Sequence, residues 1–598
     1  MLTILAAIPL AGALAMMTLL QMNSRQAGLM TLTLVCTMVF VVPAFHLSPL
    51  QLLLSLFEGG ATSLTVLTVI LPALLLYHLQ RATGGMNILT QNIARLTSDR
   101  DLQVLLIVLG LSPFIESICG FGVGIIVIAP MLLELRFSAL RVALLCLVGQ
   151  LTTAWGAMGV AIVLTASLTK LPVAQIGSLT ALLSIPTTIV LSLFCLYLSG
   201  GKAAVRRWWL LALAAAAILT CGAWTLSKTV GVELVGILSS SFTLLFLGGV
   251  GAIATRLNLQ SQEASHKGNT GATNWDSLWS AALPYMLLTF FLLLSRLVPS
   301  LRDWLQTHAV LEFPAAHLSL PLLYIPGFWV SLSLLIAVVI NSTPRHVAID
   351  AMGAAWRQFT PSALAILFFL LTAQVMQASS MTASLAASAA SLGTSYVWIS
   401  PWLAGLGAWL TGSNVGGTAM FAQLQKAAAS STGLSLLWLA AAQNGAGQLA
   451  RMLSPACLML AATSAGLQGQ EGLIIRKFGP LVLWSIALMM LLLSGIMTPS
   501  PLVVCLLVVL LALPCLPTLR PFFLAMPALE SGRVSSSLPR DTLRRVRRRT
   551  VILSRKDRVY SPGRRYRKDR AYSPGRRYKD GAQRTRSLKE LKEPLFFK

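Results

Sequence analysis

Two ionisable side chains lie deep inside apolar stretches of this sequence. Glu116 lies within SPFIESICGFGVG (112–124), and Arg451 lies within QNGAGQLARMLSP (443–455). A charged group at the centre of a lipid bilayer costs at least about 2.5–3.5 kcal/mol, so a residue of this kind is a candidate functional residue. A carboxyl group held out of water can take up and release a proton near neutral pH, and a guanidinium can bind a carboxylate through two parallel hydrogen bonds. The two residues predict a proton carrier and an anion site.

Polar side chains accompany both ionisable residues. Asn444 and Gln448 precede Arg451 at spacings that place all three on one face of a helix. A second polar group lies in TGSNVGGT (411–418), and the helical arm that follows it would point free backbone N–H groups at an anion. The side chains of this group that we expect to contact the anion are Ser413, Asn414 and Thr418.

Each of these residues also has a purely structural interpretation. The Glu116 carboxylate could do no more than accept hydrogen bonds from unwound backbone. Arg451 could pair with Glu116 or extend toward the membrane surface. Ser413, Asn414 and Thr418 could act only as helix caps.

The composition requires a membrane to position these residues. The chain has 598 residues, of which 56% are hydrophobic and 11% charged, with a mean hydropathy of +0.76; soluble domains average about 25% charged residues. Apolar blocks of about 20 residues, the length that spans a bilayer as a helix, recur along the chain. They predict an all-α polytopic membrane protein with about 13 spanning helices. The blocks cover approximately 2–20, 27–45, 61–79, 139–165, 175–198, 208–227, 232–254, 278–298, 324–341, 363–383, 434–466, 478–497 and 502–519.

Two further apolar stretches, 103–135 and 397–425, are interrupted by glycines near their middles. A continuous helix of the first length would run about 50 Å, well beyond a hydrocarbon core of about 30 Å. A hairpin of two half-length arms around an unwound tip fits better. The glycines that we expect to form unwound backbone are Gly120, Gly122, Gly412, Gly416 and Gly417.

The distribution of Lys and Arg predicts how the hairpins enter the membrane. If 103–135 enters and leaves by one face, 15 basic residues before the C-terminal tail fall on that face and 5 on the other. Basic residues collect on the cytoplasmic side, so this arrangement places the C-terminus in the cytoplasm and the N-terminus outside. The second hairpin then enters from the opposite face, which is the inverted repeat of many secondary transporters.

Other chemistry finds no support in the sequence. The six histidines form no ligand pair, and the eight cysteines are scattered through apolar segments without metal-ligand spacing. The segment GFGVG (120–124) has neither the strand nor the lysine of a nucleotide-binding loop. We therefore predict no metal, no cofactor and no enzymatic activity.

The C-terminal region differs from the rest of the chain. Residues 531–598 hold 23 basic and 6 acidic residues, and KDRVYSPGRRYR (556–567) is followed by the near-repeat KDRAYSPGRRYK (568–579). This composition predicts disorder. We divide the chain into a transporter domain, 1–519, and a basic cytoplasmic tail, 520–598. The tail could contact anionic lipid, or it could be a solvated extension or an altered reading frame without a role in transport; we expect no specific nucleic acid.

The residues around the two hairpins resemble those of the bacterial lactate permease family. The resemblance covers the chain from the first span to about Leu519, and it implies a symporter of the bacterial inner membrane that takes up lactate, and often glycolate, with a proton. The sequence differs from the commoner pattern at Val123-Gly124, Asn414, Gln443 and Arg451, where alanine-proline, Asp, Asn and Lys are frequent. The motifs that carry the resemblance are PFIE (113–116), GFG (120–122), GAMG (156–159), TGSN (411–414) and RMLSP (451–455).

The function that we predict is proton-driven symport of L-lactate or a related small 2-hydroxymonocarboxylate. In this hypothesis Glu116 carries the proton, while Arg451 and the tip around Asn414 bind the anion. A carrier of another organic anion, or a sodium-coupled one, remains an alternative on the same frame. An alternative of another class is a membrane scaffold whose basic tail recruits a partner. Whether the chain forms a homo-oligomer is left open.

Overall fold

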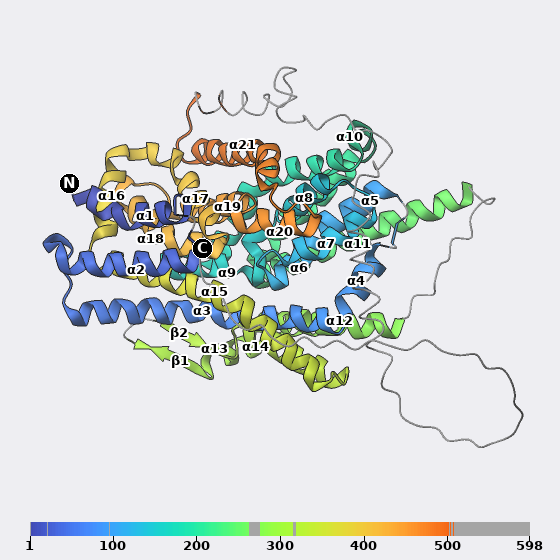
Figure 1. The fold of residues 1–598 in the computed structure, drawn as a ribbon, viewed down its shortest axis with the longest axis horizontal. Helices are drawn as coiled ribbons and strands as arrows, with labels where there is room; N and C mark the ends of the chain where they lie inside the picture. The colour runs from blue at the N-terminus through green and yellow to red at the C-terminus, as the bar shows by residue number, and fades with distance from the viewer. Residues whose placement is uncertain are drawn as a thin grey trace, which may run out of the picture. The chain divides into compact units, whose positions relative to one another are not determined.

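The computed structural model describes residues 2–20, 22–94, 96–97, 99–261, 275–314, 318–501, 503 and 506. Almost all of this part of the chain is helical (Figure 1). Its two short strands, β1 (Val310–Phe313) and β2 (Leu318–Pro321), form an antiparallel pair in which Leu311 faces Leu320. Eight of the described helices are long and apolar enough to cross a membrane, or nine if one bent pair counts as a span. The prediction of an all-α polytopic membrane protein is confirmed, whereas the count of about 13 spans stays a prediction.

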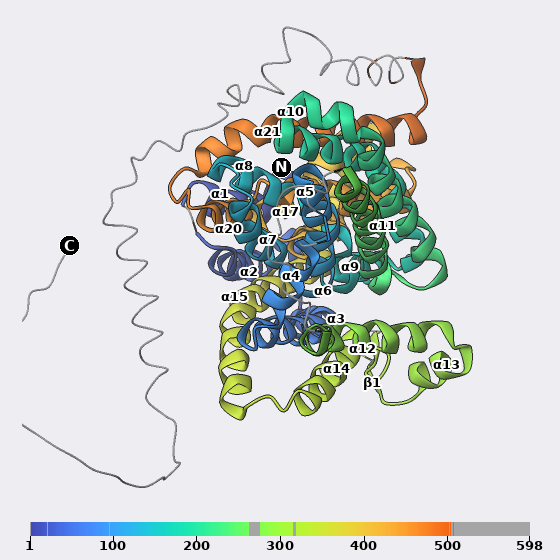
Figure 2. The same ribbon diagram turned by 90° about the vertical axis from the view of Figure 1, so that its right-hand side faces the viewer.

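Two pairs of long helices lie side by side along one flank of the bundle (Figure 2). The longest members, α3 and α15, pack against each other, while α2 packs on α15 and α14 on α3. The α3–α15 contact is close because Gly59 lies against Leu371, where an added Cβ would come within 2.9 Å of the Leu371 Cα. Small residues allow this approach between membrane helices. The four helices are α2 (Ser24–Val41), α3 (Pro49–Ala82), α14 (Pro326–Ile340) and α15 (Arg345–Ala378).

The first predicted hairpin is present. Its descending arm consists of α5 (Arg100–Leu105), the π-helical turn η2 (Leu106–Leu111) and α6 (Ser112–Cys119), and its returning arm is α7 (Val123–Glu134). The arms lie against each other, because an added Cβ on Gly124 would come within 2.8 Å of the Ser112 Oγ. At the open end, the Arg100 guanidinium lies 3.9 Å from the centre of the Phe137 ring. The chain therefore returns to the end of the bundle at which it entered.

The tip of this hairpin turns through left-handed backbone. Gly120, Phe121 and Gly122 have φ values of 69°, 56° and 78°, a region that glycine adopts without the steric cost that other residues meet. The glycines on both sides of Phe121 thus make the reversal possible, as the sequence predicts.

The second hairpin is also present, but its unwound tip is shorter than predicted. Gly412 leaves helical geometry with a φ of 68°, whereas Gly416 and Gly417, predicted to be unwound, are helical. The hairpin consists of α17 (Ser400–Thr411) and α18 (Asn414–Thr432), preceded by the 3-10 turn η5 (Gly393–Trp398). The Gln425 side chain closes its open end by donating to the Ser400 carbonyl at 3.0 Å and accepting from the Tyr396 hydroxyl at 3.0 Å. This hairpin enters from the end of the bundle opposite to the first, and the two tips meet in the middle (Figure 1).

A broken helix follows each hairpin. After the first come α8 (Ala139–Val148), the 3-10 turn η3 (Thr153–Trp155) and α9 (Gly156–Thr169), with a bend of 60° between the helices. After the second come α19 (Leu436–Arg451) and α20 (Pro455–Ala465). In the sequence these regions are plain apolar blocks, 139–165 and 434–466, and their breaks were not predicted. Polar residues replace helical backbone contacts at both breaks, which lie beside the hairpin tips.

The same order of elements occurs twice along the chain. A long helix, a short helix, a hairpin and a broken helix run from α3 to α9 and again from α15 to α20. The contacts repeat as well, since α20 packs against α7 and α9 packs against α18. With the two hairpins entering from opposite ends, this is the predicted inverted repeat. The short helices are α4 (Gly85–Ala94) and α16 (Met381–Leu392).

The remaining helices surround this core. α10 contains both predicted blocks 175–198 and 208–227, and it is kinked where Gly200 and Gly201 leave helical geometry. Residues 507–519 of the last predicted block and the whole tail, 520–598, lie outside the described residues. The surrounding elements are α1 (Leu2–Thr18), the 3-10 turn η1 (Pro43–Phe45), α10 (Val173–Thr229), α11 (Val232–Ser261), α12 (Trp275–Leu297), α13 (Pro299–Thr307) and α21 (Glu471–Met497).

Candidate functional site

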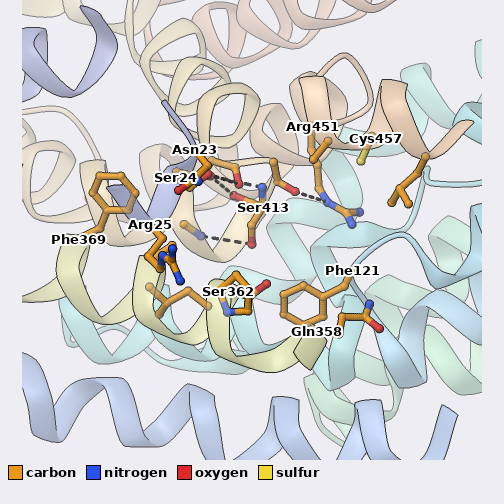
Figure 3. Close-up of a pocket in the computed structure, with 18 residues that line it drawn as sticks. Asn23, Ser24, Arg25, Phe121, Gln358, Ser362, Phe369, Ser413, Arg451 and Cys457 are labelled. Carbon is orange, nitrogen blue, oxygen red and sulfur yellow. Dashed lines mark hydrogen bonds between the residues drawn. The ribbon is translucent and has the colours of Figure 1, made fainter. Parts of the chain in front are cut away.

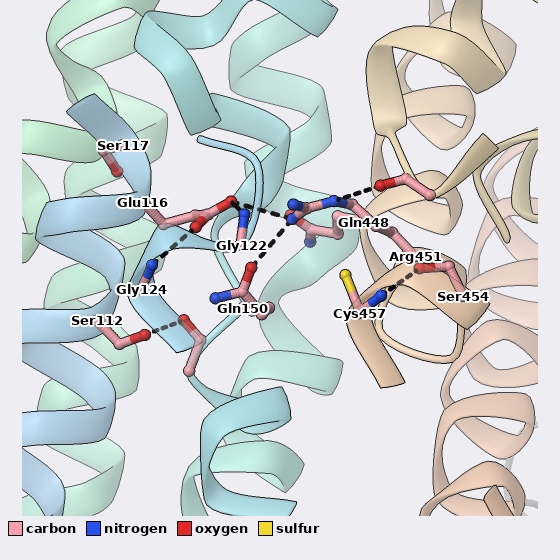
Figure 4. A network of polar contacts seen from close by, with 12 residues as sticks. Ser112, Glu116, Ser117, Gly122, Gly124, Gln150, Gln448, Arg451, Ser454 and Cys457 are labelled. Atoms are coloured by element: carbon pink, nitrogen blue, oxygen red, sulfur yellow. Dashed lines mark hydrogen bonds and ion pairs between the residues drawn. The ribbon is translucent and has the colours of Figure 1, made fainter. Parts of the chain in front are cut away.

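Glu116 and Arg451 form a buried ion pair at the point where the two hairpin tips meet (Figure 4). The Arg451 Nη1 lies 3.1 Å from the Glu116 Oε1, and the two side chains are 5% and 1% exposed. Glu116 comes from α6 near the first tip, and Arg451 is the last residue of α19 before its break. Taking two charges out of water costs several kcal/mol per ion, which the pair recovers only with good geometry and further hydrogen bonds.

Backbone N–H groups of the first tip supply part of that compensation. The Gly122 N–H donates to the Glu116 Oε1 at 3.1 Å, and the Gly124 N–H donates to Oε2 at 3.3 Å. The structural interpretation of Glu116 is therefore realised in this structure: its carboxylate accepts hydrogen bonds from the unwound backbone of its own hairpin. The position that we predict for proton coupling also holds the first tip together.

Arg451 connects that tip to the second one. Its Nε donates to the Gly412 carbonyl at 3.1 Å, and its Nη1 donates to the Gln150 Oε1 at 3.0 Å. Within the described part of the chain, this guanidinium forms its hydrogen bonds and ion pair through Nε and Nη1, and none of them uses Nη2. Three interrupted segments thus converge on one side chain: the first tip through Glu116, the second tip through Gly412, and the break after α8 through Gln150.

The predicted polar face of α19 is turned toward the first repeat. The Gln448 Nε2 donates to the Ser184 hydroxyl at 3.0 Å, and its Oε1 accepts from the Ala154 N–H at 3.2 Å. The Asn444 Nδ2 donates to the Thr165 hydroxyl at 3.0 Å. These contacts join α19 to α9, α10 and η3, so the two amides tie the repeats together beside Arg451.

The second tip shows capping by one of its three predicted side chains. The Ser413 hydroxyl accepts from the Gly416 N–H at 3.4 Å and caps α18. The Asn414 Nδ2 instead donates to the Asn444 carbonyl in α19 at 3.3 Å. Thr418 is fully buried in the first turns of α18.

Several buried polar atoms near this junction have no hydrogen-bond partner among the described residues. In native proteins such atoms bond to protein, water or ligand, and each calls for an explanation. They include both donors and acceptors, and they come from the first break, the second tip and α19. The atoms are the Gln150 Nε2, the Thr152 and Thr153 Oγ1, the Asn414 Oδ1, the Thr418 Oγ1 and the Asn444 Oδ1.

A cavity of about 390 Å³ opens beside the ion pair (Figure 3). Four of the predicted site residues line it: Arg451, Gly412, Ser413 and Gly416. Asn414, Thr418, Asn444 and Gln448 do not line the cavity. Its volume falls within the range of about 300–1,000 Å³ that is typical of small-molecule sites.

The opposite wall contains residues that the sequence analysis does not single out. Phe121 comes from the first tip, Arg25 from the start of α2, and Gln358 and Ser362 from α15. The position of Phe121 between two tip glycines was a usable signal; the other three belong to no motif. With Arg25 and Arg451 on its walls and no acidic side chain among the described lining residues, the cavity favours an anion. No group of three or more His, Cys, Asp and Glu side chains in the described ranges could hold a metal ion.

The close approach of α19 to the second tip depends on Gly447, because a Cβ added there would overlap the Asn414 Oδ1. We expect Gly447→Ala to lower the free energy of unfolding by about 1–3 kcal/mol, the usual cost of overpacking. Thermal unfolding of the purified protein in detergent measures this as a lower Tm. Gly353→Ala in α15, where an added Cβ meets nothing within 4 Å, is the matched control. Equal Tm values for the two variants would contradict the prediction.

Comparison with known proteins agrees with this architecture. A family model described as L-lactate permease matches residues 3–503. The L-lactate permease of Streptococcus iniae is 27% identical over 448 residues, 73% of this chain and 93% of the relative. That of Escherichia coli (strain K12) is 26% identical over 454 residues, 68% and 80% of the two chains. The glycolate permease GlcA of the same strain is 24% identical over 517 residues, 79% and 91%.

These relatives are permeases, and the matched region contains both hairpins and both broken helices. The resemblance noted in the sequence is confirmed, and the protein is a multi-pass membrane transporter rather than an enzyme. The chain belongs to the L-lactate permease family.

Proposed function

We propose that this protein carries a small 2-hydroxymonocarboxylate, such as L-lactate or glycolate, across the bacterial cytoplasmic membrane together with a proton. The observation that carries the proposal is the buried Glu116–Arg451 pair at the junction of the two hairpin tips. The named relatives are lactate and glycolate permeases, which supports this substrate class.

The anion site is the wall of the cavity around Arg451. A carboxylate in the cavity can reach the guanidinium, whose Nη2 forms no hydrogen bond or ion pair with the described residues, and Arg25 adds positive charge opposite. Ser413, Ser362 and Gln358 line the same cavity and can bond a 2-hydroxy group or bound water. A substrate with one carboxylate and one hydroxyl matches this set of donors and acceptors.

The ion pair also supplies a reason for coupling. Arg451 keeps its positive charge, which one carboxylate beside it neutralises. Either the Glu116 carboxylate or the carboxylate of the substrate can be that partner. When the substrate carboxylate takes the place of Glu116, the displaced carboxylate is left buried, and accepting a proton removes its uncompensated charge. One proton therefore enters with each anion, and both leave together when the ion pair forms again.

The distribution of charge supports an orientation with the N-terminus outside and the C-terminus in the cytoplasm. Arg25, which lines the cavity, belongs to the basic residues assigned to the cytoplasmic face. The cavity beside Arg451 then faces the cytoplasm. We propose 520–598 as a solvated basic extension of the transporter domain, 1–519, in contact with anionic lipid.

Uptake by reconstituted vesicles tests the proposal. With an inward proton gradient, vesicles containing the purified protein should accumulate L-lactate, because each unit of pH difference can drive about 10-fold accumulation when one proton accompanies one anion. Glycolate should compete, whereas a dicarboxylate such as succinate should not.

The same vesicles separate the alternatives. If a sodium gradient at equal pH drives accumulation, sodium and not the proton is the coupling ion. If the vesicles accumulate another organic acid but not lactate, the substrate is that acid. A chain truncated before residue 533 should transport normally; loss of uptake on this truncation would favour the scaffold with a recruiting tail.

A further inference from the structure

A second cavity lies at the end of the bundle that the charge distribution places outside. Its volume is about 600 Å³. It is bounded by α9, by the segment that joins α10 to α11, by the end of α12 and by the segment from β2 to α14. Two basic side chains, Lys170 and Arg296, line it together with one acidic side chain, Glu233. The cavity therefore carries a net positive charge.

Arg296 is held rigidly but is only partly satisfied. Its Nη2 donates to the Glu233 Oε1 at 2.9 Å and to the Tyr324 carbonyl at 3.1 Å, and its guanidinium carbon lies 3.5 Å from the centre of the Tyr324 ring. The residue is 6% exposed, and its Nε and Nη1 are buried without a hydrogen-bond partner among the described residues.

Unused donors on a buried guanidinium are unfavourable, because an arginine stays charged and each buried N–H without an acceptor forfeits its hydration. One carboxylate, Glu233, already occupies Nη2. A further acceptor of negative charge fits the Nη1 side of the guanidinium, which has no partner among the described residues. Lys170 forms no ion pair within the described ranges. The chemistry of the cavity thus matches a small carboxylate.

The inner end of the cavity approaches the central site. Met158 and Val160 line it, and Met158 belongs to the turn at the start of α9 in which Ala157, Met158 and Gly159 all have positive φ. The same turn touches the first hairpin tip, since a Cβ added to Gly120 would come within 2.9 Å of the Ala157 Cβ. The cavity therefore extends from the end of the bundle to the turn that separates it from Glu116.

We propose that Arg296 and Lys170 form a second carboxylate site, which holds the anion at the outer entrance before it reaches Arg451. The site is distinct from the central one: no residue lines both cavities. The choice of a monocarboxylate as its ligand rests on the proposed function, whereas the existence of the site rests on the geometry of Arg296.

Protection of an introduced thiol tests the site. Ser319 is exposed, lines the cavity and contributes no charge, so Ser319→Cys places a reporter there. The protein also carries Glu116→Gln and Arg451→Gln, which remove both charges of the central ion pair. Modification by an anionic methanethiosulfonate reagent is followed by mass spectrometry of the peptide that contains position 319, so the native cysteines do not interfere.

L-Lactate at saturating concentration should slow this modification by about 3-fold or more, because a ligand in a concave site shields most of the surrounding surface. The protection should disappear when Arg296→Gln is combined with Glu233→Gln, an exchange that leaves no unpaired charge. Lys170→Asn should weaken it; this exposed residue has a φ of 62°, which asparagine tolerates. Lys228→Gln is the control, because Lys228 lies at the same end of the bundle against the Trp224 ring and does not line the cavity.

The outcomes distinguish this site from the proposed function. If lactate does not slow modification of Ser319→Cys in the protein with Glu116→Gln and Arg451→Gln alone, the second site is overturned. Protection by lactate that persists after the Arg296→Gln and Glu233→Gln exchanges also overturns it. Lactate protection in a protein whose vesicles take up no lactate leaves the site standing and refutes the transport substrate. Because Lys170 is exposed, Lys170→Asn still tests the site if the combined exchange of the buried Arg296 and its partner Glu233 prevents folding.

Discussion

Arg451→Ala should reduce lactate uptake by at least about 100-fold, since it removes the anion's partner and leaves the Glu116 carboxylate buried alone. Breaking a buried pair from one side typically costs about 3–5 kcal/mol, and this variant also loses the hydrogen bonds to Gly412 and Gln150. We expect a lower Tm in detergent together with the loss of transport. Initial rates in proteoliposomes, normalised to reconstituted protein, give the measurement.

Two further variants separate a local role from a general loss of structure. Arg451→Lys keeps the charge, and lysine is the residue that the resemblance shows to be frequent here; it should retain uptake within about 10-fold of the parent. Combining Arg451→Ala with Glu116→Gln removes the unpaired charge and should recover most of the Tm without recovering uptake. Unchanged uptake by Arg451→Ala would remove this residue from the anion site.

Glu116→Gln should uncouple the carrier from the proton gradient. Glutamine has nearly the shape of a protonated glutamate, and its carbonyl oxygen can still accept the Gly122 or Gly124 N–H, but it cannot bind and release a proton. Accumulation driven by a pH difference should therefore vanish, whereas exchange of labelled for unlabelled lactate, which needs no net proton movement, should continue. Gradient-driven uptake and counterflow, measured on the same vesicles, distinguish the two activities.

Glu134→Gln is the matched control for this variant. Glu134 ends the returning arm of the same hairpin and is exposed, so its replacement should leave both activities unchanged. If Glu116→Gln still accumulates lactate against a pH-driven gradient, another group carries the proton. If it loses exchange as well, Glu116 acts in holding the first tip and its role in coupling is refuted.

The two hairpins could be predicted from local features of the sequence. The lengths of 103–135 and 397–425 exceed a membrane span, and their central glycines permit the left-handed backbone that the tip at 120–122 adopts. Both signals are local, because span length and backbone freedom depend on residues close together in the chain. For the same reason the cost of burying a charge identified Glu116 and Arg451 before any contact was known.

The breaks after α8 and α19 escaped the sequence analysis. Gln150 and Thr152 interrupt an apolar block no more than many membrane helices tolerate, and glycines such as Gly156 and Gly159 also occur where straight helices pack closely. Each break lies against a hairpin tip. A Cβ added to Gly120 would come within 2.9 Å of the Ala157 Cβ, and one added to Gly412 within 2.9 Å of the Ala456 Cβ. These contacts come from distant parts of the chain.

Taken by itself, the sequence determined the class of the protein, its hairpins, its inverted repeat and the two buried charges, since hydropathy, length and glycine positions act locally. Only the tertiary structure decided that Glu116 and Arg451 bond to each other, that Arg25 and Phe121 face the cavity, and that Arg296 holds unused donors in a second one. These facts depend on which distant helices meet. That is set by packing across the two repeats, which no stretch of sequence contains alone.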